Sequence, residues 1–171
     1  MAMIDNSENY RQGDDNFSRR VTIGWKWQDF VADHIENRGL PVERNREHYI
    51  RKWEERYKDK NEWDLRVYGK YIEVKGQKRS FGDKPDSFPL PKTIVMTVHS
   101  WNNQNPKPSM VLLVSQVTGS ILGILCDEVS RKQWSVDKLF DHDRGFYDDF
   151  YRCDKRNMIT FDEVIKWLLE T

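Results

Sequence analysis

Acidic and basic side chains alternate with aliphatic ones between residues 61 and 77, in the stretch NEWDLRVYGKYIEVKGQ. Asp64 lies nine residues before Glu73, and Lys75 follows Glu73 after one intervening residue. Two carboxylates that converge on one point bind a hard divalent cation such as Mg²⁺ through oxygen. Such a cation lowers the pKa of a bound water, and a neighbouring lysine orients that water or offsets charge on the phosphate under attack. These residue types therefore suit metal-dependent hydrolysis of a phosphodiester.

A β-hairpin would bring these side chains onto one face. A two-residue turn at Gly69-Lys70, with glycine first as in a type II′ turn, predicts five pairs: Tyr68 with Tyr71, Val67 with Ile72, Arg66 with Glu73, Leu65 with Val74 and Asp64 with Lys75. Because side chains alternate along a strand, one face is then aliphatic and belongs to the core. The other face carries the charged residues, with Gln77 beyond them.

The same geometry has a second interpretation. The charged residues can form cross-strand ion pairs on a solvated face, Arg66 with Glu73 and Asp64 with Lys75. Exposed pairs of this kind are common and weak. By pattern alone, surface ion pairs and a chemical site both stay open.

At these residues the sequence resembles the PD-(D/E)XK nuclease superfamily, which has the restriction-endonuclease-like fold. Asp64 and the run Glu73-Val74-Lys75 match the family motif in spacing and strand context, and Gln77 resembles an extra polar position of some resolvase-like members. The upstream helix ending in ENRG and the run around Asp64 are similar to small bacterial and phage members. The resemblance extends over residues 24 to about 125.

The resemblance implies an α/β fold, with a mixed central β-sheet flanked by α-helices in a single domain over residues 21–171. It implies an Mg²⁺-dependent DNA endonuclease, with Mn²⁺ able to substitute, of a structure-specific or repair and recombination type. Asp64, Glu73 and the Val74 carbonyl would hold the metal, and Lys75 and Gln77 would complete the catalytic set. A homodimer is expected because cutting both DNA strands usually takes two sites.

One departure from the family concerns the first helix. Many members carry a glutamate there that helps to hold the metal, and in this chain its place falls on Gln28, with Asp29 beside it. An amide brings no charge to a metal site. This supports a second hypothesis, a nucleic-acid-binding protein that keeps the fold without cutting. A third hypothesis is an interaction protein whose hairpin carries only surface ion pairs.

Local patterns predict the elements around the hairpin. Residues 1–20 are expected to form a flexible arm, 24–38 a helix that ends at Gly39, and 44–60 a more exposed helix. Residues 78–92 read as a loop, 93–101 as a strand with a short helix as the alternative, and 110–116 with 120–126 as a buried hairpin. Thr160 is the predicted N-cap of a final helix, with Glu163 completing a capping box. No element is predicted over 127–158.

Charge distribution points to candidate phosphate contacts. The formal net charge is zero, yet residues 38–60 hold eight basic and five acidic residues, and residues 66–92 hold seven and three. Candidate nucleic-acid contacts are Lys78, Arg79 and Lys84 in the loop after the hairpin, and Arg44 and Arg46 in the second predicted helix. A plain solvated helix is an equal alternative for the last two.

The remaining features argue against other classes of function. No apolar run approaches the roughly 20 residues of a transmembrane helix, so no membrane partner is expected, and the cytoplasm is the expected location, that of the host cell if the protein is phage-encoded. His34 and His99 are expected to be packed or hydrogen-bonded, His34 in the first helix and His99 in a strand. Cys126 and Cys153 form no disulfide framework or zinc motif.

Overall fold

A six-stranded mixed sheet forms the centre of the fold, in the order β1-β2-β3-β5-β6-β9, and a three-stranded sheet in the order β4-β8-β7 packs beside it. The computed structural model describes residues 12–45 and 63–170, with side chains from residue 24 onward. In chain order the elements are α1 (Gln12–Glu36), β1 (Glu43–Arg44), β2 (Leu65–Val67), β3 (Lys70–Gln77), the short 3₁₀ helix η3 (Pro85–Ser87), β4 (Lys92–Thr97), α2 (Val98–Asn103), β5 (Met110–Ser115), β6 (Ile121–Leu125), α3 (Glu128–Arg131), β7 (Ser135–Asp141), β8 (Phe146–Asp154), the 3₁₀ helix η4 (Lys155–Asn157), β9 (Ile159–Thr160) and α4 (Phe161–Glu170).

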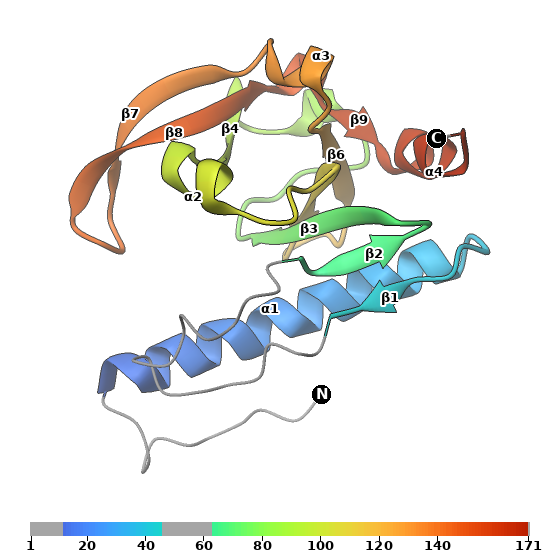
Figure 1. Cartoon of the computed structure of the whole chain (residues 1–171), viewed down its shortest axis with the longest axis horizontal. Helices are drawn as coiled ribbons and strands as arrows, with labels where there is room; N and C mark the ends of the chain where they lie inside the picture. The colour runs from blue at the N-terminus through green and yellow to red at the C-terminus, as the bar shows by residue number, and fades with distance from the viewer. Residues whose placement is uncertain (1–11, 46–62, 171) are drawn as a thin grey trace.

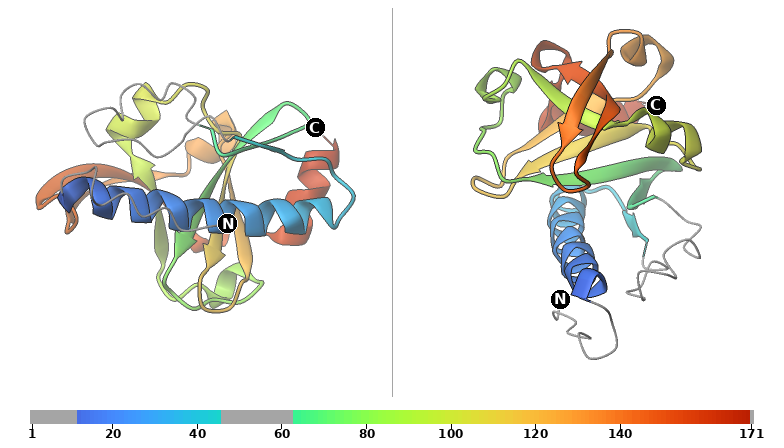
Figure 2. Two further views of the ribbon diagram at one scale, coloured as in Figure 1. Left: turned by 90° about the horizontal axis from the view of Figure 1, so that it is seen from below. Right: turned by 90° about the vertical axis from the view of Figure 1, so that its left-hand side faces the viewer.

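The central sheet is covered on both faces. Figure 1 shows α1 along one face and the second sheet with α2 along the other, and the end-on view of Figure 2 shows the same layers. The first core joins α1 and α4 to the sheet through Val31, Ile35, Leu112, Val164 and Leu168. The second core joins the other face of β5 and β6 to the second sheet and α2. Burial on both sides explains why β5 reads as a continuous apolar run, MVLLVS.

Helix α1 is longer than the sequence predicts. It begins at Gln12, so residues 12–20 of the expected flexible arm are helical, and it ends at Glu36. The predicted stop is confirmed, because Gly39 has a φ of 89° and its amide bonds to the Glu36 carbonyl at 2.9 Å. The interpretation of His34 is also confirmed: its Nδ1 lies 2.8 Å from the Phe30 carbonyl, and its ring packs on the Phe30 ring.

The β2–β3 hairpin forms with a different register from the predicted one. Leu65 pairs with Ile72 and Val67 with Lys70, which places the two-residue turn at Tyr68-Gly69. The φ angles of Tyr68 and Gly69 are 49° and 77°, as a type I′ turn requires. The turn prediction at Gly69-Lys70 was therefore wrong by one residue. The pairing shifts by two residues, an even number, so every side chain keeps its predicted face.

The aliphatic face of this hairpin packs as predicted. Leu65 and Val67 are fully buried, Ile72 is 1% exposed, and Val74 packs against the same core. Position 76 on this face must be small: a Cβ added to Gly76 would lie 2.7 Å from the Gln116 side-chain nitrogen and 3.1 Å from Cδ1 of Trp27. Gly76 therefore allows α1 to approach β3 closely.

Several other local predictions are confirmed. Residues 110–115 and 121–125 pair antiparallel around a turn in which Gly119 has a φ of 77°. The capping box of α4 forms in both directions, with the Glu163 amide donating to Thr160 Oγ1 and the Thr160 amide donating to Glu163 Oε1. Residues 93–101 combine both alternatives, because β4 ends at Thr97 and α2 begins at Val98. His99 thus lies in a helix, and its predicted strand position was wrong.

One region differs from the sequence prediction, and another lies mostly outside the described residues. Residues 127–158, for which no element was predicted, form α3 and the long β7–β8 hairpin. Most of the second predicted helix, over 44–60, lies outside the described part of the chain, which does not include residues 46–62. Its first residue, Arg44, belongs to β1.

Replacing Tyr68 with asparagine is expected to stabilise the fold by about 0.5 to 1 kcal/mol, because asparagine tolerates a left-handed backbone and is preferred in type I′ turns. The Tyr68 side chain is 54% exposed and gives up little packing. Chemical denaturation would measure the change. Tyr68→Phe keeps the unfavourable backbone angle and serves as the matched control; equal midpoints for the two variants would contradict the prediction.

Gly123→Ala is expected to destabilise the fold by about 1 to 3 kcal/mol, since overpacking a filled core has costs of this size. The added Cβ would lie 2.6 Å from Cγ2 of Val164 and 3.0 Å from Cγ1 of Ile159. Gly24→Ala is the matched control, because nothing lies within 4 Å of its added Cβ, and it should stabilise α1 by about 0.5 to 1 kcal/mol. Thermal unfolding of both variants checks the opposite signs.

Candidate functional site

Asp64 is fixed at the entrance of β2 by hydrogen bonds to both carboxylate oxygens. The Val74 amide donates to Oδ2 at 2.8 Å, and Gln28 Nε2 donates to Oδ1 at 3.1 Å. The backbone is held as well, because the Asn45 amide donates to the Asp64 carbonyl at 3.0 Å. Asn45 is 2% exposed, and its side chain donates to the Trp63 carbonyl at 2.7 Å. Strand β3, helix α1 and the end of β1 thus position one carboxylate together.

The Glu73 side chain points away from the aliphatic face of the hairpin, toward α2. Its Oε1 lies 3.8 Å from Lys75 Nζ. Its Oε2 is buried and has no hydrogen-bond partner. A buried carboxylate oxygen without a donor is costly, so this atom is suited to a cation.

The observed register ends at the pair Leu65–Ile72. Asp64 and Glu73 are the next residues beyond that last pair, one from each side of the hairpin. Asp64 extends toward α1 and the Val74 amide, and Glu73 lies beside α2. The predicted pair of Asp64 with Lys75 was therefore wrong.

Carboxylate and carbonyl oxygens are the ligands that a hard divalent cation prefers. Val74 directs its amide to Asp64, and in an extended strand the carbonyl of a residue points to the same side as its amide. The Val74 carbonyl and the carboxylates of Asp64 and Glu73 would then be the protein ligands, with water completing the shell as Mg²⁺ prefers. Among the described residues there is no group of three or more His, Cys, Asp or Glu side chains that could hold a metal.

Lys75 and Gln77 lie further along β3, on the Glu73 side. Lys75 stays next to Glu73 and is about one-third exposed. Gln77 is four residues from Glu73, which is about 13 Å along a strand. Its Nε2 donates to Thr93 Oγ1 at 3.2 Å, and its Oε1 is buried without a partner. Lys75 therefore lies beside Glu73, whereas Gln77 faces β4.

The two first-helix candidates point to different neighbours. Gln28 reaches Asp64, while Asp29 Oδ1 accepts from Arg44 Nη1 at 2.9 Å. Arg44 also binds Asp33 at 2.8 Å and pairs with Glu36. Hydrogen bonds to these carboxylates, the one to Asp33 first, raise the pKa of Arg44 above its usual value, and burial acts in the opposite direction. Of the two, only Gln28 contributes to the site.

The predicted phosphate contacts also have different surroundings, some bound by carboxylates and others exposed. Arg44 is engaged by three carboxylates of α1 and fastens β1 to that helix. Lys78 and Arg79 are exposed and line an open groove next to Lys75. Lys84 is exposed at the start of η3 and is not among the residues that line this groove. Arg46 lies outside the described residues.

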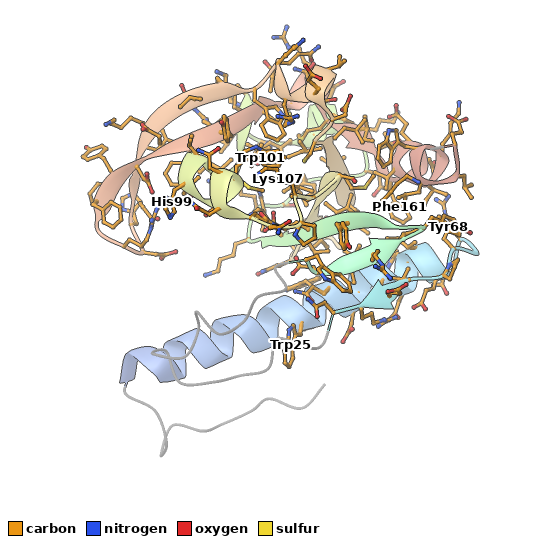
Figure 3. All side chains as sticks on the ribbon, viewed as in Figure 1. Trp25, Tyr68, His99, Trp101, Lys107 and Phe161 are labelled. Atoms are coloured by element: carbon orange, nitrogen blue, oxygen red, sulfur yellow. The ribbon has the colours of Figure 1, made fainter. Side chains whose placement is uncertain are left out.

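Sequence reasoning missed a polar pocket beside Glu73. Glu73 and four residues of α2 and its C-terminal cap line a cavity of ≈ 360 Å³: His99, Ser100, Asn103 and Gln104. Figure 3 labels His99 and Trp101 on α2; Trp101 is 6% exposed and packs inward, while His99 is exposed. The sequence carried one signal for α2, because Thr97 is a residue type preferred at helix N-caps. In the structure Thr97 caps the helix by accepting from the Ser100 amide at 3.0 Å.

The surface-ion-pair interpretation made a specific prediction for Arg66. The structure pairs Arg66 with Glu43 of β1, at 2.8 Å, and not with Glu73. Glu73 is instead next to Lys75 on its own strand. The predicted Arg66–Glu73 pair was wrong, and the arrangement leaves Glu73 available to a ligand.

The cysteines take no part in nucleophilic chemistry at neutral pH. Both are free and buried. Burial raises the pKa of Cys126 above its usual value, with the negative charge of Glu73 adding to the effect, and burial raises the pKa of Cys153 to about 12. A thiol with such a pKa stays protonated and is a poor nucleophile.

Comparison of the chain with protein-family models, with curated proteins and with solved structures found no match. Within the described residues, no helix has both the length and the apolar character needed to cross a membrane.

Gln28→Glu is expected to make the free protein less stable by about 1 kcal/mol, because a third carboxylate would face Asp64 in place of a donor. Saturating Mg²⁺ or Mn²⁺ should then stabilise the variant more than the parent, since a ligand bound only by the folded state adds about 2.7 kcal/mol at a hundredfold excess over its Kd. Thermal unfolding in EDTA and in metal measures both effects. Gln28→Ala removes the donor without adding charge, and an equal metal response in the two variants would contradict the site.

Proposed function

We propose that this protein is a metal-dependent phosphodiester hydrolase that acts on DNA as an endonuclease. The proposal rests on two acidic residues at the end of the β2–β3 pairing, Asp64 and Glu73, with Lys75 beside Glu73. Glu73 Oε2 is buried without a hydrogen-bond partner, and Asp64 is held rigidly by Val74 and Gln28. Because a buried carboxylate oxygen without a donor lowers stability, this arrangement favours a cation-binding role over a purely structural one.

The order of elements supports the same proposal. A helix, an antiparallel pair and a crossover to a strand parallel to β3 occur in sequence, as α1, β2–β3 and then β5. This resembles the restriction-endonuclease-like fold, in which the two halves of the motif lie on the antiparallel pair. The crossover departs from the family, since it holds β4 and the short α2 in place of one longer helix.

Each residue has a defined part in the proposed reaction. A bound Mg²⁺ would supply a water of lowered pKa and neutralise charge on the phosphate. Asp64, Glu73 and the Val74 carbonyl would hold it, and the Val74 amide and Gln28 fix the direction of Asp64. The Lys75 ammonium would orient the attacking water and offset the negative charge that builds on the phosphate oxygens.

Two further expectations belong to this proposal. The resemblance to small phage and resolvase-like members favours a structure-specific or repair and recombination enzyme, encoded by a phage or a bacterium. Cutting both strands of a duplex would take two copies of the site, which favours a homodimer.

A second candidate function is nucleic-acid binding without cleavage. Gln28 favours it, because it supplies an amide where many family members supply a carboxylate, and two carboxylates hold a metal less tightly than three. Calorimetric titration with Mn²⁺ separates the candidates: the nuclease requires binding that is lost in Asp64→Asn, whereas salt-dependent DNA binding with no metal binding would favour the second candidate.

Lys75→Ala is expected to lower the rate of DNA cleavage by about 10²-fold or more, in line with the loss of a positioned charge at a reacting phosphate. The assay incubates supercoiled plasmid and branched DNA with the protein and Mg²⁺. Lys166→Ala, on the exposed side of α4, is the matched control for loss of one lysine. Equal cleavage by Lys75→Ala and the control, or no cleavage by the parent protein, would refute the nuclease.

A further inference from the structure

An open groove of ≈ 670 Å³ begins at Lys75 and runs between the end of β3 and the second sheet. Its lining carries five cations: Lys75, Lys78, Arg79, Lys92 and Arg152. No carboxylate is among the described residues that line it. Asp137 lies behind the lining, 3.9 Å from Lys92 and 3.4 Å from Arg152, and offsets part of their charge. Lys78 and Arg79, the exposed cations at the start of the groove, are suited to contact phosphate.

The same groove has an apolar wall, which a phosphate-binding surface does not need. Leu90 and Ile94 are 38% and 41% exposed, and Leu139 of β7 also lines the groove, on the same face of the second sheet as Ile94. Exposed aliphatic side chains next to cations match the two parts of a nucleotide, a charged phosphate and a flat apolar base.

Two buried polar atoms of the lining lack partners. Gln77 Oε1 and Arg152 Nε are both buried without a hydrogen bond. The other ends of these side chains are anchored, Gln77 Nε2 on Thr93 Oγ1 at 3.2 Å and Arg152 Nη1 near Asp137. Because both atoms are sealed from solvent, a base edge reaches them only if these side chains move.

We propose that this groove holds an unpaired nucleotide of the nucleic-acid strand that is bound at Asp64 and Glu73, an inference that rests on the proposed function. A paired duplex presents phosphates on its outside and keeps its base edges inside its grooves. It would cover the cations but leave the apolar wall without a partner. A single strand places its phosphates on Lys78 and Arg79 and turns a base toward Ile94 and Leu139.

Lys75 links the groove to the reaction centre. It is next to Glu73 and also lines the groove. A strand whose scissile phosphate lies at the carboxylates therefore enters the groove with the adjoining nucleotide. The substrate class that follows is DNA with a single-stranded end, flap or splayed junction, in preference to a fully paired duplex.

Fluorescence anisotropy in EDTA tests the groove without any cleavage. The probes are a labelled mixed-sequence 12-mer single strand, the same 12-mer as a blunt duplex, and a duplex with a single-stranded flap. We expect the single strand and the flap to bind at least about tenfold more tightly than the duplex, since burial of roughly 60 Å² of apolar surface changes affinity by about this factor. An RNA 12-mer that binds equally would support the same groove for both sugars.

Groove variants make the test specific. Ile94→Gln and Leu139→Gln should each weaken single-strand binding by about tenfold and leave duplex binding within about twofold. Val129→Gln, an exposed valine on α3, is the matched control. Lys78→Ala with Arg79→Ala should lower the salt slope of single-strand binding by about 1.4, the value for two lost phosphate contacts.

The outcomes separate the groove from the nuclease. Equal affinity for single strand and duplex, or groove variants that behave like Val129→Gln, would overturn the groove even if plasmid is cleaved. Preferential single-strand binding that the groove variants abolish would support it even if no DNA is cut, and the nuclease alone would then fail.

Discussion

A single hydrogen bond, from the Val74 amide to the Asp64 carboxylate, determines the geometry of the candidate site. The backbone ladder between β2 and β3 ends at Leu65 and Ile72. Beyond it, a side-chain oxygen takes the place that a backbone carbonyl of β2 would occupy. Charge-assisted bonds of this kind are short and strong. Because a side chain replaces the backbone acceptor here, the two strands can separate beyond this point while the Asp64 carboxylate stays bound to β3. The Glu73–Lys75 pair then follows from strand alternation.

Much of the hairpin could be predicted because its information is local. Alternation of side chains fixed which residues share a face, and the even shift in register left that result unchanged. The turn was misplaced because a tyrosine in the left-handed region is uncommon, and the sequence offered glycine at a more usual position. The capping box at Thr160 and the helix end at Gly39 are likewise local signals, and both formed as expected.

The parts that could not be predicted depend on contacts distant in the chain or on an inverted pattern. In β7 two apolar residues face outward, with Val136 56% and Phe140 41% exposed, while three polar residues, Ser135, Asp137 and Asp141, share the half-buried face with Leu139. Periodicity therefore gave no usable inside face. Arg44 was interpreted by its charge alone, whereas its three partners lie on a helix that precedes it and meet it only in the fold. The position of α2 beside Glu73 is a tertiary property of the same kind.

The absence of a side chain at Gly76 reaches beyond packing. Trp27 and Gln28 are neighbours on α1, so the spacing that lets the Trp27 ring rest on the bare backbone of β3 also sets how far the Gln28 amide must extend to meet Asp64. The hydrogen atom that stands in place of a side chain at Gly76 thus sets the distance between β3 and α1. The direction of the Asp64 carboxylate, at the entrance of β2, is consequently tied to the absence of a side chain at Gly76.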